Sequence, residues 1–144
     1  MKKVHEWNPE TGTASCIIEY NNQKFGGYAS CHPDDLPFIS PLTGGYIAEG
    51  RANIKYYQHI KNNELYPQIK VLKHLLNTIE NSKNYSPKDN MVIVKRIRKE
   101  LNLKNIELEK IKNAIEAEKK NLKDYIIAKD NFHKKLGKKK QSSN

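Results

Sequence analysis

Four chemically capable side chains lie close together in the stretch SCHPDDLPF, residues 30–38. Cys31, His32, Asp34 and Asp35 are of the residue types that bind metal ions or carry out acid–base chemistry. A zinc site would need at least one further pair of ligands, and the nearest histidine and cysteine in the chain lack metal-type spacing. Adjacent residues of an extended segment point to opposite faces, which disfavours a Cys–His pair. We therefore interpret the stretch as a structural bend and expect no metal site.

The rest of the sequence contains no recognisable catalytic motif. It has no glycine-rich phosphate loop, no nucleophile elbow and no His-Glu-x-x-His. The stretch TGGYIAEG has three glycines, but it lacks the lysine of a P-loop and the spacing of a dinucleotide-binding motif. We interpret it as a hinge between a sheet and a helix. The sequence therefore predicts a protein that is not an enzyme and that has no catalytic residue and no cofactor.

Residues 1–42 are predicted to form an antiparallel β-meander that ends in a proline-rich bend. KKVHEW, TASCIIEY and QKFGGYASC are rich in β-branched and aromatic residues, and turn sequences separate them. The prolines at positions 33, 37 and 41 prevent a further strand. If the strands pair directly across the Asn-Asn turn, Cys16 lies opposite Gly27, too far from Cys31 for a disulfide.

Residues 43–82 follow a helical pattern in which Thr43 is a plausible N-cap. A second apolar stripe begins at Leu65, five residues after Ile60, and Pro67 follows it. Because proline removes a backbone donor and crowds the preceding turn, we predict two helices, or one helix kinked near 62–67. The two stripes are Ile47, Ile54, Tyr57 and Ile60, and then Leu65, Ile69, Leu72, Leu76 and Ile79.

Residues 83–137 are predicted to form a long coiled-coil helix. Ser86 followed by Pro87 is typical of a helix start, and Gly137 is the expected end. A seven-residue apolar repeat over this length is typical of a coiled coil. The tail, residues 138–144, is basic and is expected to be disordered. The first repeat position holds Val94, Leu101, Leu108, Ile115, Leu122 and Leu136, and the second holds Ile97, Ile111, Tyr125 and Phe132.

The predicted fold class is α+β, an N-terminal antiparallel β-meander followed by helices that end in a long coiled-coil-like helical hairpin. About 48 helical residues would extend about 70 Å at 1.5 Å per residue. The apolar stripe of residues 65–80 can cover only part of that length. We therefore expect a second chain to cover the rest, in a homodimer or larger homo-oligomer.

The net charge of +10 is unevenly distributed. Residues 1–50 hold three lysines against six acids, whereas residues 51–144 hold 23 bases against 10 acids. A strongly basic body indicates a polyanionic partner, although excess lysine also keeps long helices soluble. No run of 18 apolar residues and no secretory signal is present, so we expect a cytoplasmic protein with reduced cysteines and no membrane partner.

Two clusters of basic and aromatic residues are the candidate binding sites for a ligand or nucleic acid. KRIRK places four cations within two helical turns at a helix start, where backbone N–H groups and guanidinium groups together suit phosphate. RANIKYYQ places two cations one turn apart beside tyrosines, a mixture that can stack a base or hold a phosphate. The alternative is solvated cations and packed tyrosines. The candidate residues are Arg51, Lys55, Tyr56, Lys95, Arg96, Arg98 and Lys99.

In its layout the chain resembles small accessory proteins of bacteriophages. The likeness is of a general type and is carried by WNPETGTASCIIEY, GGYASCHPDD and GGYIAEGRANIKY, followed by a Lys/Glu-rich coiled coil. The resemblance implies a non-enzymatic inhibitor of a bacterial immune system, one that binds a CRISPR effector or sequesters a nucleotide signal in the host cytoplasm. The alternatives are a nucleic-acid-binding phage regulatory or replication protein and a structural coiled-coil scaffold.

Overall fold

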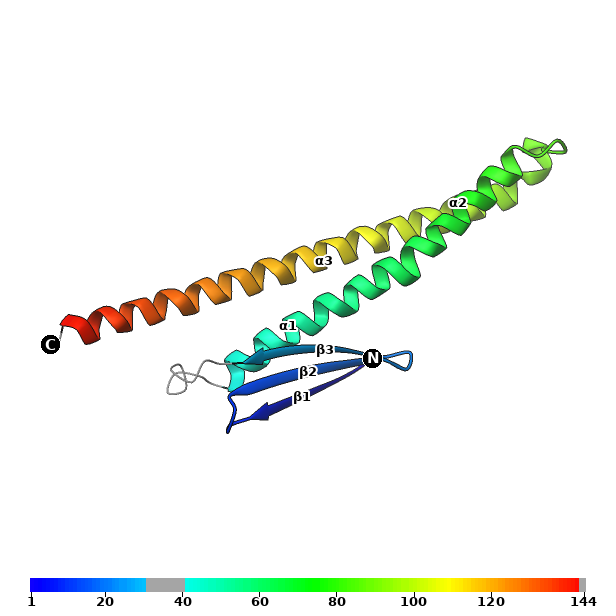
Figure 1. Ribbon diagram of the computed structural model, residues 1–144. Coiled ribbons are helices and arrows are strands. Elements are labelled where there is room, and N and C mark those ends of the chain that lie inside the picture. Colours follow the sequence, from blue (N-terminus) through cyan, green and yellow to red (C-terminus); the bar gives the residue numbers. More distant parts are fainter. Residues whose placement is uncertain (31–40, 143–144) are drawn as a thin grey trace. The chain divides into compact units, whose positions relative to one another are not determined.

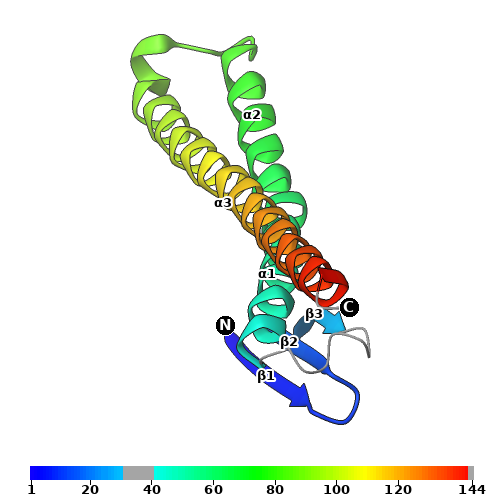
Figure 2. The same ribbon diagram turned by 90° about the vertical axis from the view of Figure 1, so that its left-hand side faces the viewer.

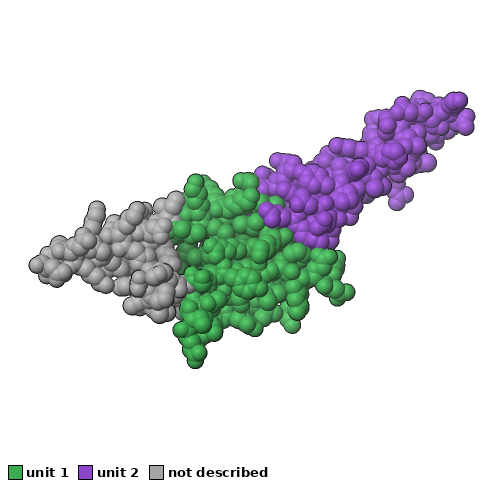
Figure 3. Space-filling model, in the orientation of Figure 1, with its two compact units in different colours: residues 1–56, 115–144 green, residues 57–114 purple. Residues whose placement is uncertain are grey.

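The computed structural model describes the backbone of residues 1–30 and 41–142 and the side chains of residues 1–30 and 43–126. The predicted α+β class is confirmed, because a three-stranded antiparallel sheet precedes the helices. The chain forms two compact units, unit 1 from residues 1–56 and 115–144 and unit 2 from residues 57–114 (Figure 3). The elements in chain order are β1 (Lys2–Asn8), β2 (Thr13–Tyr20), β3 (Gln23–Ser30), α1 (Pro41–His59), the π-helix η2 (Ile60–Leu65), α2 (Tyr66–Glu80) and α3 (Pro87–Ser142) (Figure 1).

The sheet has the predicted meander topology, with strand order β1-β2-β3. Asn21 and Asn22 form the turn between β2 and β3 with φ values of 47° and 61°, a left-handed conformation that asparagine tolerates better than most residues. This turn sets the register and places Cys16 opposite Gly27, as the sequence predicts. One face of the sheet is therefore lined by small and apolar side chains that alternate along β2 and β3.

The core of unit 1 depends on a close approach between α1 and β3. Ala48 and Ala52, both fully buried, lie over Gly27. A Cβ atom added at Gly27 would overlap the backbone of both alanines, so only glycine fits at this position. The helix crosses this face of the sheet (Figure 2) and covers the buried side chains of Cys16 and Ile18.

The opposite side of α1 packs against the part of α3 that belongs to unit 1. Gly50 lies against Leu122, and the side-chain amide of Asn53 donates a hydrogen bond of 3.2 Å to Glu118. The glycines of TGGYIAEG therefore do not form a hinge, as we had expected. They lie inside a continuous helix. Gly44 lies against the sheet and Gly50 against Leu122, so the missing side chains at these two positions allow close packing on both sides of α1.

In unit 2, the five-residue step between the two apolar stripes is a π-helix and not a break. In an α-helix, residues five apart point in different directions, whereas a π-helix closes i→i+5 hydrogen bonds and brings them to one face. Ile60 and Leu65 consequently join the same apolar cluster. Pro67 lies at the start of α2, directly after the π-helix, where it can donate no hydrogen bond to the preceding turn. The predicted interruption near 62–67 is thus correct in place, but the alternatives of two helices or a sharp kink are replaced by a wide helical turn.

Helices α2 and α3 pack antiparallel within unit 2. Ile69 and Leu108 share a buried cluster, and the guanidinium of Arg98 contacts the carboxylate of Glu80 at 2.6 Å. The described part of the seven-residue repeat lies along a seam that is buried within one chain. Over residues 94–122 this seam is buried without a second chain, so the repeat there does not require one. The homo-oligomer itself stays a prediction. The buried members of the seam are Val94, Ile97, Leu108, Ile115 and Leu122.

The observed ends of α1 and α3 can be compared with the helix boundaries that the sequence predicts. The backbone N–H of Asp89 lies 3.4 Å from the hydroxyl of Ser86, which supports the predicted start of α3. Helix α1 begins at Pro41, before the expected Thr43, because proline suits a first helical turn. Helix α3 extends to Ser142, past its expected end at Gly137 and into the tail that we expected to be disordered. A single glycine costs a helix only about 1 kcal/mol, and the lysines that follow are good helix formers.

Replacing Gly27 by alanine tests the packing of unit 1. The added methyl group overlaps helix backbone, so we expect Gly27→Ala to lower the free energy of unfolding by about 1 to 3 kcal/mol, measured by urea denaturation. Gly45→Ala is the matched control, because a Cβ atom at Gly45 meets nothing within 4 Å. This control should instead raise stability by about 0.5 to 1 kcal/mol through helix propensity. Equal effects of the two substitutions would contradict the proposed packing.

Candidate functional site

Arg51 and Lys55 of α1 are engaged at the edge of the sheet. The guanidinium of Arg51 donates a hydrogen bond of 2.6 Å to the carbonyl of Tyr28, and the ammonium of Lys55 donates one of 2.7 Å to the carbonyl of Gly26. Both carbonyls point outward from β3, which is an edge strand. Charged side chains that occupy an edge prevent it from pairing with another chain. These two cations therefore have a structural task, which makes them poorer candidates for binding phosphate.

Tyr56 is also committed to packing. Its ring makes edge-to-face contacts with Tyr20 and Phe25, with centroid separations of 5.3 Å and 6.0 Å, and it borders the apolar core of unit 1. Such contacts stabilise the fold, and they occupy a ring that we had expected to stack on a base. The RANIKYYQ cluster therefore matches the alternative interpretation of packed tyrosines more closely than a binding site. Its Tyr56 packs against the core and its two cations bind carbonyls of β3.

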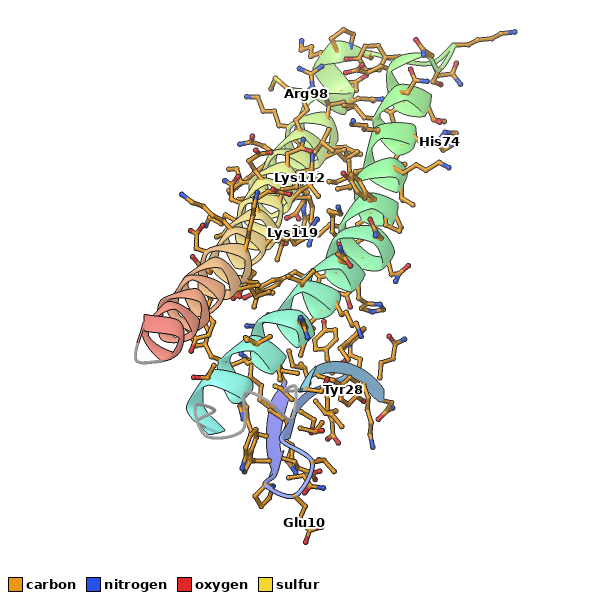
Figure 4. All side chains as sticks on the ribbon, turned by 60° about the vertical axis from the view of Figure 1, so that its left-hand side comes forward. Glu10, Tyr28, His74, Arg98, Lys112 and Lys119 are labelled. Carbon is orange, nitrogen blue, oxygen red and sulfur yellow. The ribbon has the colours of Figure 1, made fainter. Side chains whose placement is uncertain are left out.

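The KRIRK cluster is divided by the helix on which it lies. Arg98 faces α2 and forms its ion pair with Glu80 (Figure 4). Lys95, Arg96 and Lys99 are exposed, and none of them has an ion pair among the residues that the structure describes. Three of the four predicted cations thus remain available to a partner.

Lys95 and Lys99 belong to a longer row of lysines that sequence inspection missed. Lys88 and Lys110 lie on the same side of α3, because spacings of 7, 4 and 11 residues are close to whole helical turns. At 100° per residue the four lysines fall within a sector of about 60°, opposite the buried seam. We call these four residues, Lys88, Lys95, Lys99 and Lys110, the basic face. The spacing of these lysines in the sequence indicates the row, but the row is not visible as a compact cluster of basic residues.

The basic face is exposed and also carries apolar side chains. All four lysines are exposed, and no ion pair to them is found within the described side chains. Val92, Leu103 and Ile106 lie between them, and Val92 is 74% exposed. Positive charge without neutralising acids attracts polyanions, while exposed apolar side chains are typical of contact with protein. The basic face is therefore suited to a partner that offers both negative charge and an apolar protein surface.

A second cluster, also missed, lies where α1 meets β1. The carboxylate of Glu49 is 3.1 Å from the ammonium of Lys3 and 3.6 Å from the imidazole of His5. Hydrogen bonding from Lys3, together with its charge and that of His5, lowers the pKa of Glu49 despite partial burial. Alternation along β1 places Lys3 and His5 on the face that α1 covers.

Cys16 pairs with His5 across the sheet but is not placed to act as a nucleophile. Its side chain is fully buried, and this burial, with the nearby charge of Glu49, raises the pKa of the thiol. A reactive cysteine requires exposure and a lowered pKa. The arrangement is instead that of a buried cysteine packed beneath an ion pair that fastens α1 to the sheet.

The described residues contain no group of three or more His, Cys, Asp or Glu that could hold a metal ion. Cys31, His32, Asp34 and Asp35 lie outside the described residues. His74 is exposed on α2 and points away from α3 (Figure 4). No helix in the described part of the chain is both long enough and apolar enough to cross a membrane.

The chain was compared with known proteins. No protein-family model matches it, and neither the curated proteins nor the solved structures contain a match. Functional assignment therefore depends on the chemistry of the described surface.

The ion pair of Glu49 predicts an acid-dependent loss of stability. Because the pKa of Glu49 in the folded protein lies below its ordinary value of 4.5, its stabilising contribution is complete above that pH. The contribution is lost as the pH falls through the lower, folded-state value. We expect Glu49→Gln to be less stable than wild type at neutral pH and to lose less stability on acidification, as measured by urea denaturation between pH 3 and pH 7 (about the range of carboxyl titration). The same change at Glu10, which lies in the β1–β2 turn (Figure 4), should leave the pH profile unchanged.

The edge contacts of α1 predict a second effect. Arg51→Met with Lys55→Met retains most of the apolar stems but removes both donors to β3. We expect a loss of about 1 to 3 kcal/mol in the free energy of unfolding and increased self-association through the uncovered edge, measured by denaturation and light scattering. Lys70→Met with Lys73→Met is the control, because it removes two exposed charges from α2. It should neither lower the free energy of unfolding nor increase self-association.

Proposed function

We propose that this chain is a non-enzymatic binding protein whose basic face holds a polyanion, most suitably the nucleic acid of a nucleoprotein. The observation that supports this is the row of Lys88, Lys95, Lys99 and Lys110, exposed and without ion pairs among the described residues. A row of four lysines without neutralising acids binds phosphate groups of a nucleic acid and releases the counterions that surround it.

The length of the basic face favours an extended ligand. Lys88 and Lys110 are separated by about 33 Å along the helix axis, about the length of one turn of duplex DNA. A single nucleotide would instead be held in a concave pocket with converging donors. Three hollows on the described surface are each lined by other residues. A nucleic-acid backbone therefore fits this face better than a nucleotide signal does.

The apolar side chains on the same face favour a nucleoprotein over free nucleic acid. Val92, Leu103 and Ile106 would contact the protein component while the lysines contact phosphate. Combined with the likeness to small phage accessory proteins, this supports an inhibitor of bacterial immunity that binds a guide-RNA-bearing CRISPR effector in the host cytoplasm. A nucleic-acid-binding regulator of phage replication shares the phosphate contacts. A scaffold whose seven-residue repeat forms a coiled coil with further chains requires none of them.

Charge reversal on the basic face tests the proposal. We expect wild-type protein to bind a labelled 20-nucleotide RNA or a 20-base-pair DNA in fluorescence anisotropy at about 50 mM salt, and to weaken steeply by about 200 mM. Lys95→Glu with Lys99→Glu should reduce the affinity at least tenfold. It should also reduce the slope of log K against log salt by about 2, because two phosphate contacts are lost.

The matched control is Lys70→Glu with Lys73→Glu, which makes the same charge change on exposed positions of α2 in the same unit. Equal losses in the two variants would mean that only net charge matters and would contradict a specific face. Absence of binding by wild type at low salt would exclude direct nucleic-acid binding. Capture of an RNA-bearing effector from defence-expressing cells, lost in the Lys95/Lys99 variant alone, would separate the anti-defence function from replication and scaffolding.

A further inference from the structure

Unit 2 exposes an apolar strip that its own helices do not cover. Val71 and Leu75 of α2 are 65% and 44% exposed, although they lie in a helix whose other side is buried. Two antiparallel helices can bury only the stripe between them, so a second apolar stripe on α2 remains in water. Exposed apolar surface of this kind is typical of an interaction site.

The strip borders a groove between α2 and α3. The groove has a volume of about 380 Å³, and its surface is almost entirely apolar. From α2 it is lined by Pro67, Gln68, Val71 and Leu72, and from α3 by Glu100 and Lys104. All of these residues belong to unit 2. The groove lies on a different side of α3 from the basic face, because Glu100 and Lys104 are about 100° or more around the helix from the centre of the row of lysines.

The charges along the groove's α3 side alternate in sign. Arg96, Glu100, Lys104 and Glu107 follow at intervals of 4, 4 and 3 residues, which places them within a sector of about 80°. Lys104 and Glu107 already form an ion pair of 3.8 Å within the helix. Such a row is complementary to a second copy of itself that runs in the opposite direction. If a two-fold axis passes near residue 102, Glu100 of one copy lies opposite Lys104 of the other. Arg96 then lies close to Glu107 of the other copy. A parallel copy would place like charges together.

We propose that this groove binds a second copy of the chain, giving a two-fold symmetric dimer in which two α2–α3 hairpins form a four-helix arrangement. The apolar strip of one copy is buried against that of the other, and the alternating charges select the antiparallel orientation. The contact is isologous, so each copy contributes the same residues. The proposed interface is separate from the seven-residue seam, which is buried within one chain over residues 94–122.

The test is the oligomeric state of the full chain by sedimentation equilibrium, with circular dichroism to verify folding. Wild type should have twice the chain mass of 16.7 kDa at protein concentrations of roughly 10 to 100 µM. Val71→Glu should give a folded monomer, because the carboxylate would be buried in the dimer but is exposed in the single chain. Val92→Glu makes the same change at another exposed valine, on the basic face, and should remain dimeric.

Charge exchange tests the orientation and distinguishes it from general destabilisation. Glu100→Lys alone and Lys104→Glu alone should each weaken dimerisation at least tenfold, since each places like charges opposite one another. The double variant Glu100→Lys with Lys104→Glu should restore it, because the charges are again opposite. A monomeric wild type, a dimer that persists in Val71→Glu, or failure of the double variant to recover would each overturn the proposal. None of these outcomes depends on nucleic-acid binding, which Lys95 and Lys99 test separately.

Discussion

The contact of α1 with Gly27 is the constraint on which the structure of unit 1 depends. A helix can lie this close to a strand only where both surfaces lack bulky side chains, and Ala48 and Ala52 provide the other half of the contact. This proximity decides which neighbouring side chains can reach the sheet. Arg51 and Lys55 extend to the outward carbonyls of β3, while Glu49 extends to Lys3 and His5 of β1. One small-residue contact therefore determines the partners of five ionisable residues.

The structure separates cations that maintain the fold from cations that are free to bind. Arg51, Lys55 and Arg98 each have a short contact to a carbonyl or carboxylate, although all three are exposed. Lys95 and Lys99 are also exposed, but no such contact is found for them among the described side chains. The charge of a residue is thus a poor guide to function by itself. What matters is whether a neighbouring element provides a fixed acceptor within reach of the side chain.

In unit 2, the π-helix η2 adjusts the position of one apolar stripe relative to the next. One extra residue in a helical turn rotates everything that follows by about 100°. Without that turn, Ile60 and Leu65 would face different directions and the cluster with Ile69 and Leu108 would lose a member. The same rotation fixes which side of α2 faces α3. It consequently leaves Val71 and Leu75 exposed beside the groove.

Local interactions explain which features the sequence determined by itself. The Asn-Asn turn, with both residues at positive φ, determined the register that places Cys16 opposite Gly27, and Ser86 with Pro87 determined where α3 begins. The seven-residue repeat identified the buried side of α3 because burial follows helical periodicity. These features depend on residues close in sequence, whose conformational preferences act without a distant partner.

Only the tertiary structure decided what covers that repeat and which candidate residues remain available. The seam is covered by residues of α1 and α2, which are far from it in sequence. No periodicity within α3 indicates whether the cover belongs to the same chain. Likewise, RANIKYYQ contains no sign that Tyr56 packs on Tyr20 and Phe25 or that β3 offers carbonyls to Arg51 and Lys55. Long-range packing assigns these partners, because a side chain's role depends on the atoms that folding brings within a few ångströms of it.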